Sequence, residues 1–309
     1  MPLPAVFHLF IRSQSGLDPT PALKKILARG DALPALSSLS AGLCEVWNLA
    51  RQQDWPMAAL SAPVPQAAKQ VGYWLRLDPV HLEVGMRGMF VRSGMTLDAS
   101  ENRQLQALLE TVCFPHGLKL LYSDDGITHI HLDTLPDLRT TALDEAENRQ
   151  AAQGLPKGES APFWAHLLNE IQMKLHEHPL NQAREARGEL PINSLWLWGG
   201  GVLPGVFTPL PVHLHARAAW IQTCATGLGL RIAPPPSAFT HLSPARRHVV
   251  VLDDLQGDST LPGHLEQRWF APLLQALNRG RIKRLHLNLL TDHPTRVSIG
   301  PAQSWRFWR

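Results

Sequence analysis

Short apolar runs alternate with amphipathic segments at both ends of the chain. The runs at residues 5–11, 248–252 and 282–290 are dominated by apolar residues, which is typical of strands buried on both faces of a sheet. Segments with helical spacing or helix-boundary residues lie between them, at residues 21–30, 38–53, 163–175, 212–226 and 265–277. This alternation predicts an α/β fold with a mostly parallel sheet flanked by helices.

The pattern between residues 71 and 159 is different, with short strands joined by turns. Strands are predicted at 73–77, 80–84 and 89–92, and a hairpin joins 118–122 to 127–132. Asp98 and Glu101 have the spacing of a capping box, which predicts the start of a helix between the two groups of strands. We therefore predict a core domain of residues 1–70 and 160–309, with a smaller α+β module inserted at 71–159.

Composition and charge argue against several classes of protein. Of the 309 residues, 44% are hydrophobic and 18% are charged, as in folded rather than disordered chains. The net charge of +3 arises mostly within residues 281–309, too little for the broad basic surface of a nucleic-acid-binding protein. The cysteines Cys44, Cys113 and Cys224 are far apart, as suits a reducing cytosol, and no apolar run has the roughly 18 residues of a membrane span. We expect a cytoplasmic protein without a membrane or nucleic-acid partner.

Two arginines in a polar stretch before residue 190 predict an anion site. Arg184 and Arg187 are three residues apart, so on one helix face both guanidinium groups could bind a phosphate or a carboxylate. The alternative is structural, with the arginines paired to Glu185 or Glu189. The spacing alone does not distinguish the two interpretations.

The strand predicted at residues 192–198 extends this candidate site. Asn181 and Asn193 add neutral hydrogen-bonding groups. Trp198 leads into Gly199 and Gly200, whose backbone could approach a ligand at the carboxyl edge of the sheet. The structural alternative is that the glycines only turn the chain.

Acidic and histidine side chains follow two of the predicted strands. Asp292 and His293 come after strand 282–290, and Asp253 and Asp254 come after strand 248–252, with His264 further along. Because the carboxyl ends of parallel strands meet at one edge of a sheet, these residues are candidate ligands for a metal ion such as Mn²⁺ or Zn²⁺. Acidic residues are also common in turns, so the same residues have a structural interpretation.

Two further features have both a chemical and a structural interpretation. Ser38 is a candidate nucleophile, or it caps the helix that follows it. Residues 305–309, WRFWR, alternate aromatic and cationic side chains. They form either a contact for a protein partner or the last strand of the sheet.

Residues 168–201 carry a run of motifs typical of a known family. HPLN at 178–181 precedes Arg184 and Arg187, and NSLWLWGGG occupies 193–201. Together with YWLRLDPVHL at 73–82 and WRFW at 305–308, this run resembles the RpfE-type regulatory proteins of Gram-negative bacteria. More distantly, it is similar to the archaeal-type cofactor-independent phosphoglycerate mutases. That similarity implies an alkaline-phosphatase-like α/β fold with a smaller inserted domain.

The chain departs from the mutase pattern at positions that the resemblance makes catalytic. Such enzymes use two metal ions to activate a Ser or Thr nucleophile. The resemblance implies a carboxylate ligand directly after the first strand, where this chain has Arg12. Ser38 is followed by Leu39 where the enzymes carry Asp, and no histidine follows His293.

We therefore predict a degenerate, non-catalytic regulatory relative of these mutases that needs no cofactor. Its expected partner is a small phosphorylated acid or similar anion, bound by the arginines, asparagines and glycines named above. One alternative is an active mutase or phosphatase dependent on Mn²⁺ or Zn²⁺, with Ser38 as the nucleophile. Another is a protein-interaction module that uses the Trp- and Arg-rich end of the chain.

Overall fold

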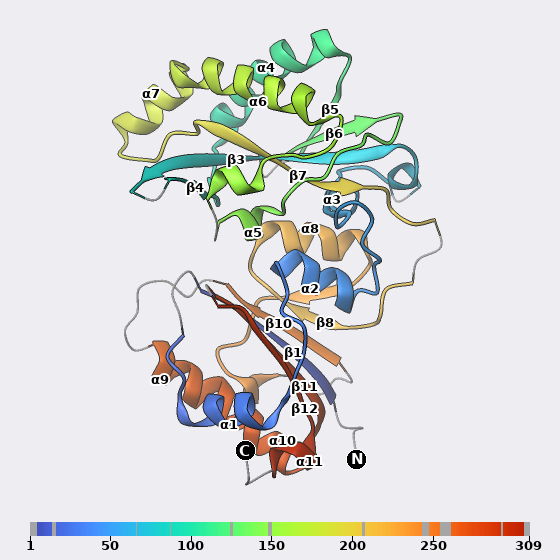
Figure 1. The fold of residues 1–309 in the computed structure, drawn as a ribbon, viewed down its shortest axis with the longest axis vertical. Helices are drawn as coiled ribbons and strands as arrows, with labels where there is room; N and C mark the ends of the chain where they lie inside the picture. The colour runs from blue at the N-terminus through green and yellow to red at the C-terminus, as the bar shows by residue number, and fades with distance from the viewer. Residues whose placement is uncertain are drawn as a thin grey trace. The chain divides into compact units, whose positions relative to one another are not determined.

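The computed structural model describes most of the chain, in two compact units. The described residues are 5–13, 17–65, 67–86, 88–123, 126–147, 150–205, 208–242, 247–253, 261–291 and 293–305. The first unit combines residues 1–42 with 209–309, and the second is residues 43–208. In Figure 1 the chain is coloured from blue at residue 1 to red at residue 309.

The first unit is built on a seven-stranded, largely parallel sheet, as predicted. β1 is central, and its pairings with β10 and β11 are both parallel; β8 and β9 continue the parallel part beyond β10. β12 and β2 extend the other side in antiparallel orientation. Across the sheet the strands are β2 (Asp31–Ala32), β12 (Thr295–Ile299), β11 (Ile282–Leu290), β1 (Ala5–Arg12), β10 (Arg247–Leu252), β8 (His213–His215) and β9 (Arg231–Ala233).

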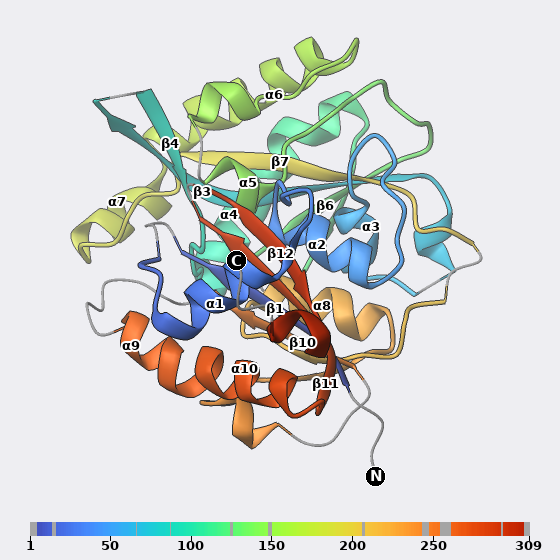
Figure 2. The same ribbon diagram turned by 60° about the horizontal axis from the view of Figure 1, so that its bottom comes forward.

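Helices cover the faces of this sheet, as Figures 1 and 2 show. α1 begins with Pro21 at its first turn, and it ends where the Gly30 N–H donates to the Ile26 carbonyl at 3.0 Å. Alternate residues of β1 (Phe7, Leu9 and others) pack against α1 and α10 in one apolar core. The helices are α1 (Pro21–Arg29), α2 (Leu39–Val46), α8 (Ala219–Gly227), α9 (Leu261–Leu265), the π-helical turn Glu266–Phe270, α10 (Ala271–Asn278) and α11 (Pro301–Ser304), with a 3₁₀ turn at Phe239–His241.

The second unit is built on an antiparallel sheet. β3 pairs with β4, β6 and β7, and β6 pairs with β5. The predicted hairpin between 118–122 and 127–132 is confirmed by the β5–β6 pair. The strands are β3 (Tyr73–Gly85), β4 (Gly88–Arg92), β5 (Lys119–Tyr122), β6 (Thr128–Leu132) and β7 (Ser194–Gly201).

The longest helices of the second unit pack on one face of that sheet. α4 begins at the predicted capping box: the Asp98 side chain accepts from the N–H groups of Ser100 and Glu101, at 2.7 and 2.8 Å. Leucines of α4 and α6 share an apolar core with β3 and β7. The helices are α3 (Met57–Ser61), α4 (Ala99–Cys113), α5 (Leu143–Ala146), α6 (Ala161–His176) and α7 (Pro179–Ala186), with 3₁₀ turns η1 (Ala68–Gln70), η2 (Phe114–His116) and η3 (Ala151–Gly154).

The placement of β7 corrects the sequence analysis. Strand 192–198 was predicted for the parallel sheet, but β7 pairs antiparallel with β3, with Leu77 opposite Leu197. All eight residues of β7 are buried, a pattern that parallel strands share, so the pattern identifies the strand but not its partner. Residues 160–208 consequently belong to the second unit, and the boundaries differ from those predicted at 70/71 and 159/160.

Three helix and strand predictions also change. Residues 212–226 begin with β8, and the helix starts only at Ala219. The helix predicted at 38–53 ends at Val46, because Asn48 takes a left-handed conformation with φ of 63°. β12 is the last strand along the described chain, and it is followed by α11 and by Trp305 in a turn. The remaining residues of the predicted last strand, 306–309, lie outside the described residues.

Candidate functional site

The carboxyl ends of the three central strands meet at one edge of the first unit's sheet. Arg12, the last residue of β1, is opposite Leu290 of β11. On the other side, Ile11 is opposite Leu252 of β10, which Asp253 follows directly. The fold thus brings together the end of β1, Asp253 and the segment that follows β11. Open α/β sheets bind their ligands at this edge.

Ser38 lies before α2, on the face of β1 that carries Arg12. Phe10 and Arg12 point to the same face of β1, and Gly42 of α2 packs so closely on Phe10 that a Cβ there would be 2.4 Å from the ring. Ser38 is 3% exposed, and its Oγ accepts from the Ala41 N–H at 3.0 Å. This is the hydrogen bond of a helix cap, and the burial leaves little access for a substrate.

The described residues do not supply a two-metal donor set at this edge. Of the five predicted ligands, Asp254 and Asp292 lie outside the described residues. His264 is in α9 and His293 follows β11. Within the described ranges, no three His, Cys, Asp or Glu side chains come close enough to share a metal ion. Arg12 adds positive charge to the same edge, which disfavours a cation there.

Glu101, buried at the start of α4, binds Arg184 of the predicted anion site. Arg184 Nη1 donates to Glu101 Oε2 at 3.0 Å and to the Thr96 carbonyl at 3.0 Å. Its Nε donates to the Leu190 carbonyl at 2.8 Å. Arg184 is 3% exposed and Glu101 is 4% exposed. The Arg184 guanidinium therefore joins α7, α4 and the chain before β7 by bonds to protein acceptors.

Arg187 extends the same ion-pair network toward solvent. Its Nη2 donates to Glu101 Oε1, and its Nε and Nη2 donate to the two oxygens of Glu189 at 3.0 and 2.9 Å. The hydrogen bonds to Glu189 and Glu101 raise the pKa of Arg187. Glu189 is one of the two carboxylates that the structural interpretation in the sequence analysis names as partners of the arginines. The Arg187 and Glu189 side chains are 43% and 44% exposed, so they form the accessible part of the network.

The two predicted asparagines hydrogen-bond the backbone. Asn181 Nδ2 donates to the carbonyls of Leu175 and Ile192, and its Oδ1 accepts from the Ile192 N–H, all at 2.8 Å. Asn193 Oδ1 accepts from the Leu82 N–H at 2.7 Å, and its Nδ2 donates to the Leu82 carbonyl at 3.0 Å. These bonds anchor α7 to the chain before β7, and that chain to β3.

Trp198 hydrogen-bonds to a buried ion pair, Arg76 and Asp78, that the sequence analysis missed. Arg76 Nε and Nη2 donate to the Asp78 carboxylate at 2.7 and 2.6 Å, and Trp198 Nε1 donates to the same carboxylate at 2.6 Å. The Arg76 Cζ lies 5.0 Å from the centre of the Trp198 ring. Arg76 and Asp78 are two apart in a strand and so share a face, a signal that could have revealed the pair.

The network continues to a serine and a histidine. Arg76 Nη1 donates to Ser61 Oγ at 3.2 Å, and Ser61 Oγ is 2.8 Å from His129 Nε2. Burial lowers the pKa of His129 to about 3, so its imidazole is neutral at pH 7. Ser61 and His129 are each 1% exposed, so a substrate cannot reach this pair. Its contribution is to hold α3 against β3 and β6.

Gly199 and Gly200 approach protein atoms closely. Gly199 has φ of +74°, and a Cβ there would lie 3.1 Å from the Ala58 nitrogen. A Cβ on Gly200 would lie 2.1 Å from the Tyr73 hydroxyl. The seven residues of the predicted cleft thus have partners in three places: the Glu101 network, the backbone around Leu82 and Ile192, and the interior around Asp78 and Tyr73.

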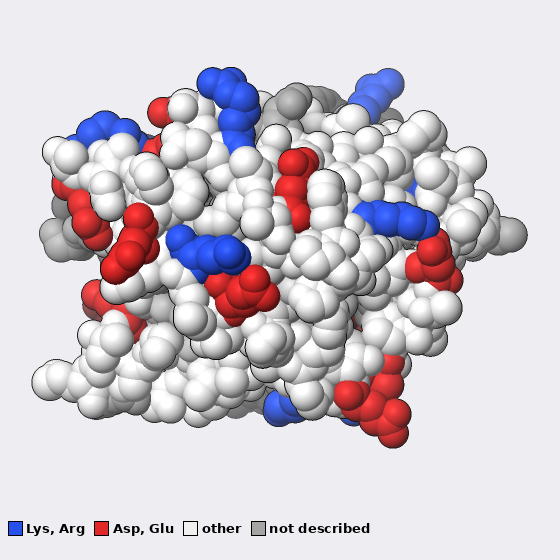
Figure 3. Space-filling view, turned by 90° about the horizontal axis from the view of Figure 1, so that it is seen from above, with Lys and Arg blue, Asp and Glu red and all other residues white. Residues whose placement is uncertain are grey.

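Charged residues are mixed on the face of the molecule shown in Figure 3. Blue Lys and Arg side chains lie among red Asp and Glu side chains, and most of that face is uncharged. This face does not present the one-sign field of a phosphate-backbone binder. In the described part of the chain, no helix combines the length and the hydropathy needed to cross a bilayer.

The fold and the sheet edge define the class of protein. The chain is a mixed α/β protein with a largely parallel sheet, and three segments of the chain meet at the carboxyl edge of that sheet. In the sequence, the second, α+β unit is inserted between residues 42 and 209 of the first. The sequence comparisons add a distant similarity to named proteins.

The chain is distantly similar to proteins named 2,3-bisphosphoglycerate-independent phosphoglycerate mutase. One from Methanosarcina mazei is 26% identical over 324 aligned positions, covering 91% of this chain and 80% of that protein. A probable mutase of this kind from Geobacter sulfurreducens is 46% identical over 153 residues, covering 48% of this chain and 38% of that protein. Matches to other proteins of this name cover between 22% and 50% of the relative.

The structural comparison gives a weaker likeness. The cofactor-independent phosphoglycerate mutase from Thermoplasma acidophilum aligns over 96% of this chain and 90% of its own, at 12% identity and a TM-score of 0.40. Because this TM-score is low, the likeness to the mutases rests on the sequence matches. No family model matches the chain. The finer resemblance to RpfE-type regulatory proteins stays a prediction.

Proposed function

We propose that this chain is a non-catalytic, regulatory relative of the cofactor-independent phosphoglycerate mutases. The observation that carries the proposal is Arg12 at the carboxyl end of the central strand, beside Asp253 and the segment after β11. The resemblance implies a metal-binding carboxylate at this position. A guanidinium there adds a positive charge where the resemblance implies a negative one.

The magnitude of that repulsion is large enough to matter. A divalent cation about 4 Å from a guanidinium is repelled by roughly 8 kcal/mol at an effective dielectric constant of about 20. That equals the binding free energy of a ligand with a dissociation constant of about 1 μM. The burial of Ser38, which is 3% exposed, supports the same proposal, because a phosphate ester in solution cannot reach a buried hydroxyl.

The proposed ligand is a small phosphorylated acid, and its binding site is the exposed part of the Glu101 network. Arg184 is buried with protein acceptors around it. Arg187 is the arginine that an anion can reach, by taking the place of the Glu189 carboxylate. The proposal therefore assigns the anion to Arg187. Arg184 binds the same Glu101 carboxylate as Arg187 and holds it in position.

Catalysis is tested first. The purified chain, supplied with Mn²⁺ or Zn²⁺ and 3-phosphoglycerate, should form no 2-phosphoglycerate and hydrolyse no generic phosphate ester. An Arg12→Asp variant should bind Mn²⁺ more tightly than the wild type in calorimetric titration, because the repulsion is replaced by attraction. Mutase turnover by the wild type that stops on chelation would overturn the non-catalytic proposal.

Anion binding is tested separately by titrating 3-phosphoglycerate into three proteins. We expect heat from the wild type and from Arg92→Ala, and at least a tenfold weaker affinity for Arg187→Ala. Arg92 is the matched control, since it is half exposed and pairs with Glu83 at 2.7 Å in the same unit. Equal heats from wild type and Arg187→Ala, or no heat from the wild type, would contradict the proposed anion site at Arg187.

A further inference from the structure

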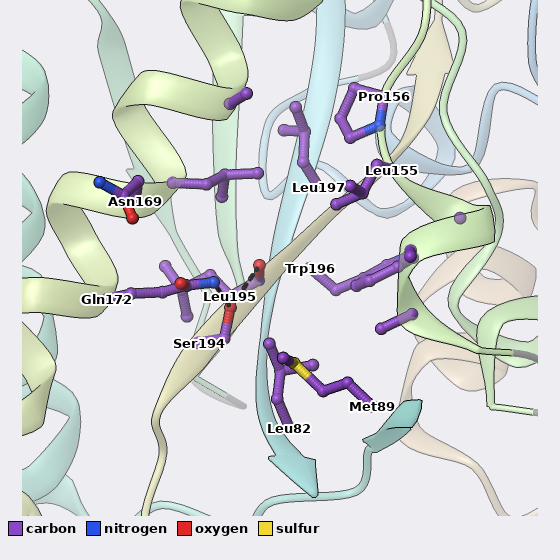
Figure 4. Close-up of a pocket in the computed structure, with 15 residues that line it drawn as sticks. Leu82, Met89, Leu155, Pro156, Asn169, Gln172, Ser194, Leu195, Trp196 and Leu197 are labelled. Atoms are coloured by element: carbon purple, nitrogen blue, oxygen red, sulfur yellow. Dashed lines mark hydrogen bonds between the residues drawn. The ribbon is translucent and has the colours of Figure 1, made fainter. Parts of the chain in front are cut away.

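The second unit contains an apolar pocket that neither the sheet edge nor the ion-pair network uses. Its volume is about 340 Å³, within the range of small-molecule sites. Figure 4 shows Gln172 reaching in from α6 on one side, and Trp196, Leu155 and Pro156 on the other. The floor is formed by the first half of β7.

The side chains that line the pocket disfavour a charged ligand. No ionisable side chain lines the pocket among the described residues; its walls are leucine, alanine, proline, methionine and tryptophan side chains. The polar side chains Gln172 and Ser194 meet at one end, where Gln172 Nε2 donates to Ser194 Oγ at 2.8 Å. A charged ligand would lose its hydration here without gaining a counter-charge.

The open edge of β7 supplies further hydrogen-bonding groups. Four consecutive residues of the strand, 194–197, line the pocket. Successive side chains of a strand point to opposite faces, so consecutive residues line one cavity only along the strand's edge. Among the described strands β7 pairs with β3 alone, which leaves the other edge without a strand partner. Edge N–H and C=O groups can therefore face a ligand.

We propose that this pocket binds an uncharged, mostly apolar small molecule that carries one hydrogen-bonding group. The polar group lies toward Gln172 and the edge of β7, and the apolar part lies between Leu168, Leu155 and the ring of Trp196. That ring is held in place because Trp196 Nε1 donates to the Thr141 carbonyl at 2.8 Å. The site is distinct from the proposed phosphorylated-acid site, whose ligand is anionic.

The test uses N-phenyl-1-naphthylamine, an uncharged dye whose fluorescence rises in apolar sites. We expect saturable binding of one equivalent by the full chain, displaced by 1-octanol and much less by octanoate at equal concentration. Ala165→Trp places a ring at the pocket wall and should weaken binding at least about tenfold. Met173→Trp is the matched control on the same helix, since Met173 is 70% exposed and does not line the pocket.

Ala165 is on the exposed side of α6, so the variant is expected to keep the wild-type urea midpoint. Binding that does not saturate, an unchanged affinity in Ala165→Trp, or equal loss in Met173→Trp would overturn the proposal. Equal displacement by octanoate and octanol would overturn the assignment of an uncharged ligand.

Discussion

Removing the Glu101 carboxylate should destabilise the second unit more than any other single carboxylate change in the ion-pair network. Glu101 is 4% exposed and accepts from Arg184 and Arg187. Its Oε2 also accepts from the Asp98 N–H at 2.9 Å and so completes the capping box of α4. In Glu101→Ala, the guanidinium of Arg184, 3% exposed, loses its buried counter-charge and keeps only the exposed Glu189 carboxylate, at 3.5 Å.

Breaking a buried ion pair by removing one partner typically costs about 3–5 kcal/mol, and the lost hydrogen bond from the Asp98 N–H adds about 1 kcal/mol. We therefore expect a loss of roughly 4 kcal/mol or more, a large share of the stability of an ordinary domain. Urea unfolding of the full chain, followed by circular dichroism, measures the loss. Tryptophan fluorescence, recorded in parallel, tests for separate unfolding of the two units.

Glu189→Ala provides the control for this prediction. Glu189 is an exposed carboxylate that binds Arg187 at 2.9 Å and lies 3.5 Å from Arg184, and exposed ion pairs contribute little. Its unfolding midpoint should stay close to that of the wild type. If Glu101→Ala and Glu189→Ala shifted the midpoint equally, the buried network would not be what holds α7 to α4.

Three further predictions concern packing, capping and pH. Gly200→Ala should cost about 1–3 kcal/mol because the new Cβ overlaps the Tyr73 hydroxyl, whereas Gly263→Ala, with nothing within 4 Å, should leave the urea midpoint unchanged or slightly higher. Ser38→Ala should lower stability by about 1 kcal/mol through the lost cap, and an unchanged urea midpoint would contradict the capping role. Folded His129 takes up a proton only near pH 3, whereas the unfolded chain does so near pH 6.5. The contribution of His129 to stability should therefore be full above about pH 6.5 and fall by about 1.4 kcal/mol per pH unit as the pH decreases toward 3, in addition to the contributions of His8 and His286, whose pKa values burial also lowers. Urea midpoints between pH 7 and pH 4 measure this slope, and a His129→Gln variant with an equally steep slope would refute its origin.

Local patterns identified the elements whose causes are local. The capping box at Asp98 and Glu101 starts α4, and the hairpin at 118–132 forms where the turn and the two alternating segments stand next to each other. The apolar runs at 5–11, 248–252 and 282–290 became the central strands β1, β10 and β11. Asp253 follows β10 at the edge where β1 also ends, as expected for parallel strands, which share a carboxyl edge.

The partners of those elements were decided by tertiary structure. β7 has the apolar pattern of a parallel strand, yet β3 takes it into an antiparallel sheet. Arg184 pairs with Glu101, which is 83 residues away. The spacing of Arg184 and Arg187 along one helix could not reveal that carboxylate. Arg76 and Asp78 share a strand face, but only the approach of Trp198 shows that the pair is buried.

The amino-acid sequence by itself therefore determined the strands, the helix starts and the positive charge at the end of β1. Each depends on residues a few positions apart. The tertiary structure decided which carboxylates neutralise which arginines, and it enclosed the apolar pocket beside β7. Burial and ion pairing depend on distant segments that fold against each other, and periodicity along the chain contains no record of those contacts.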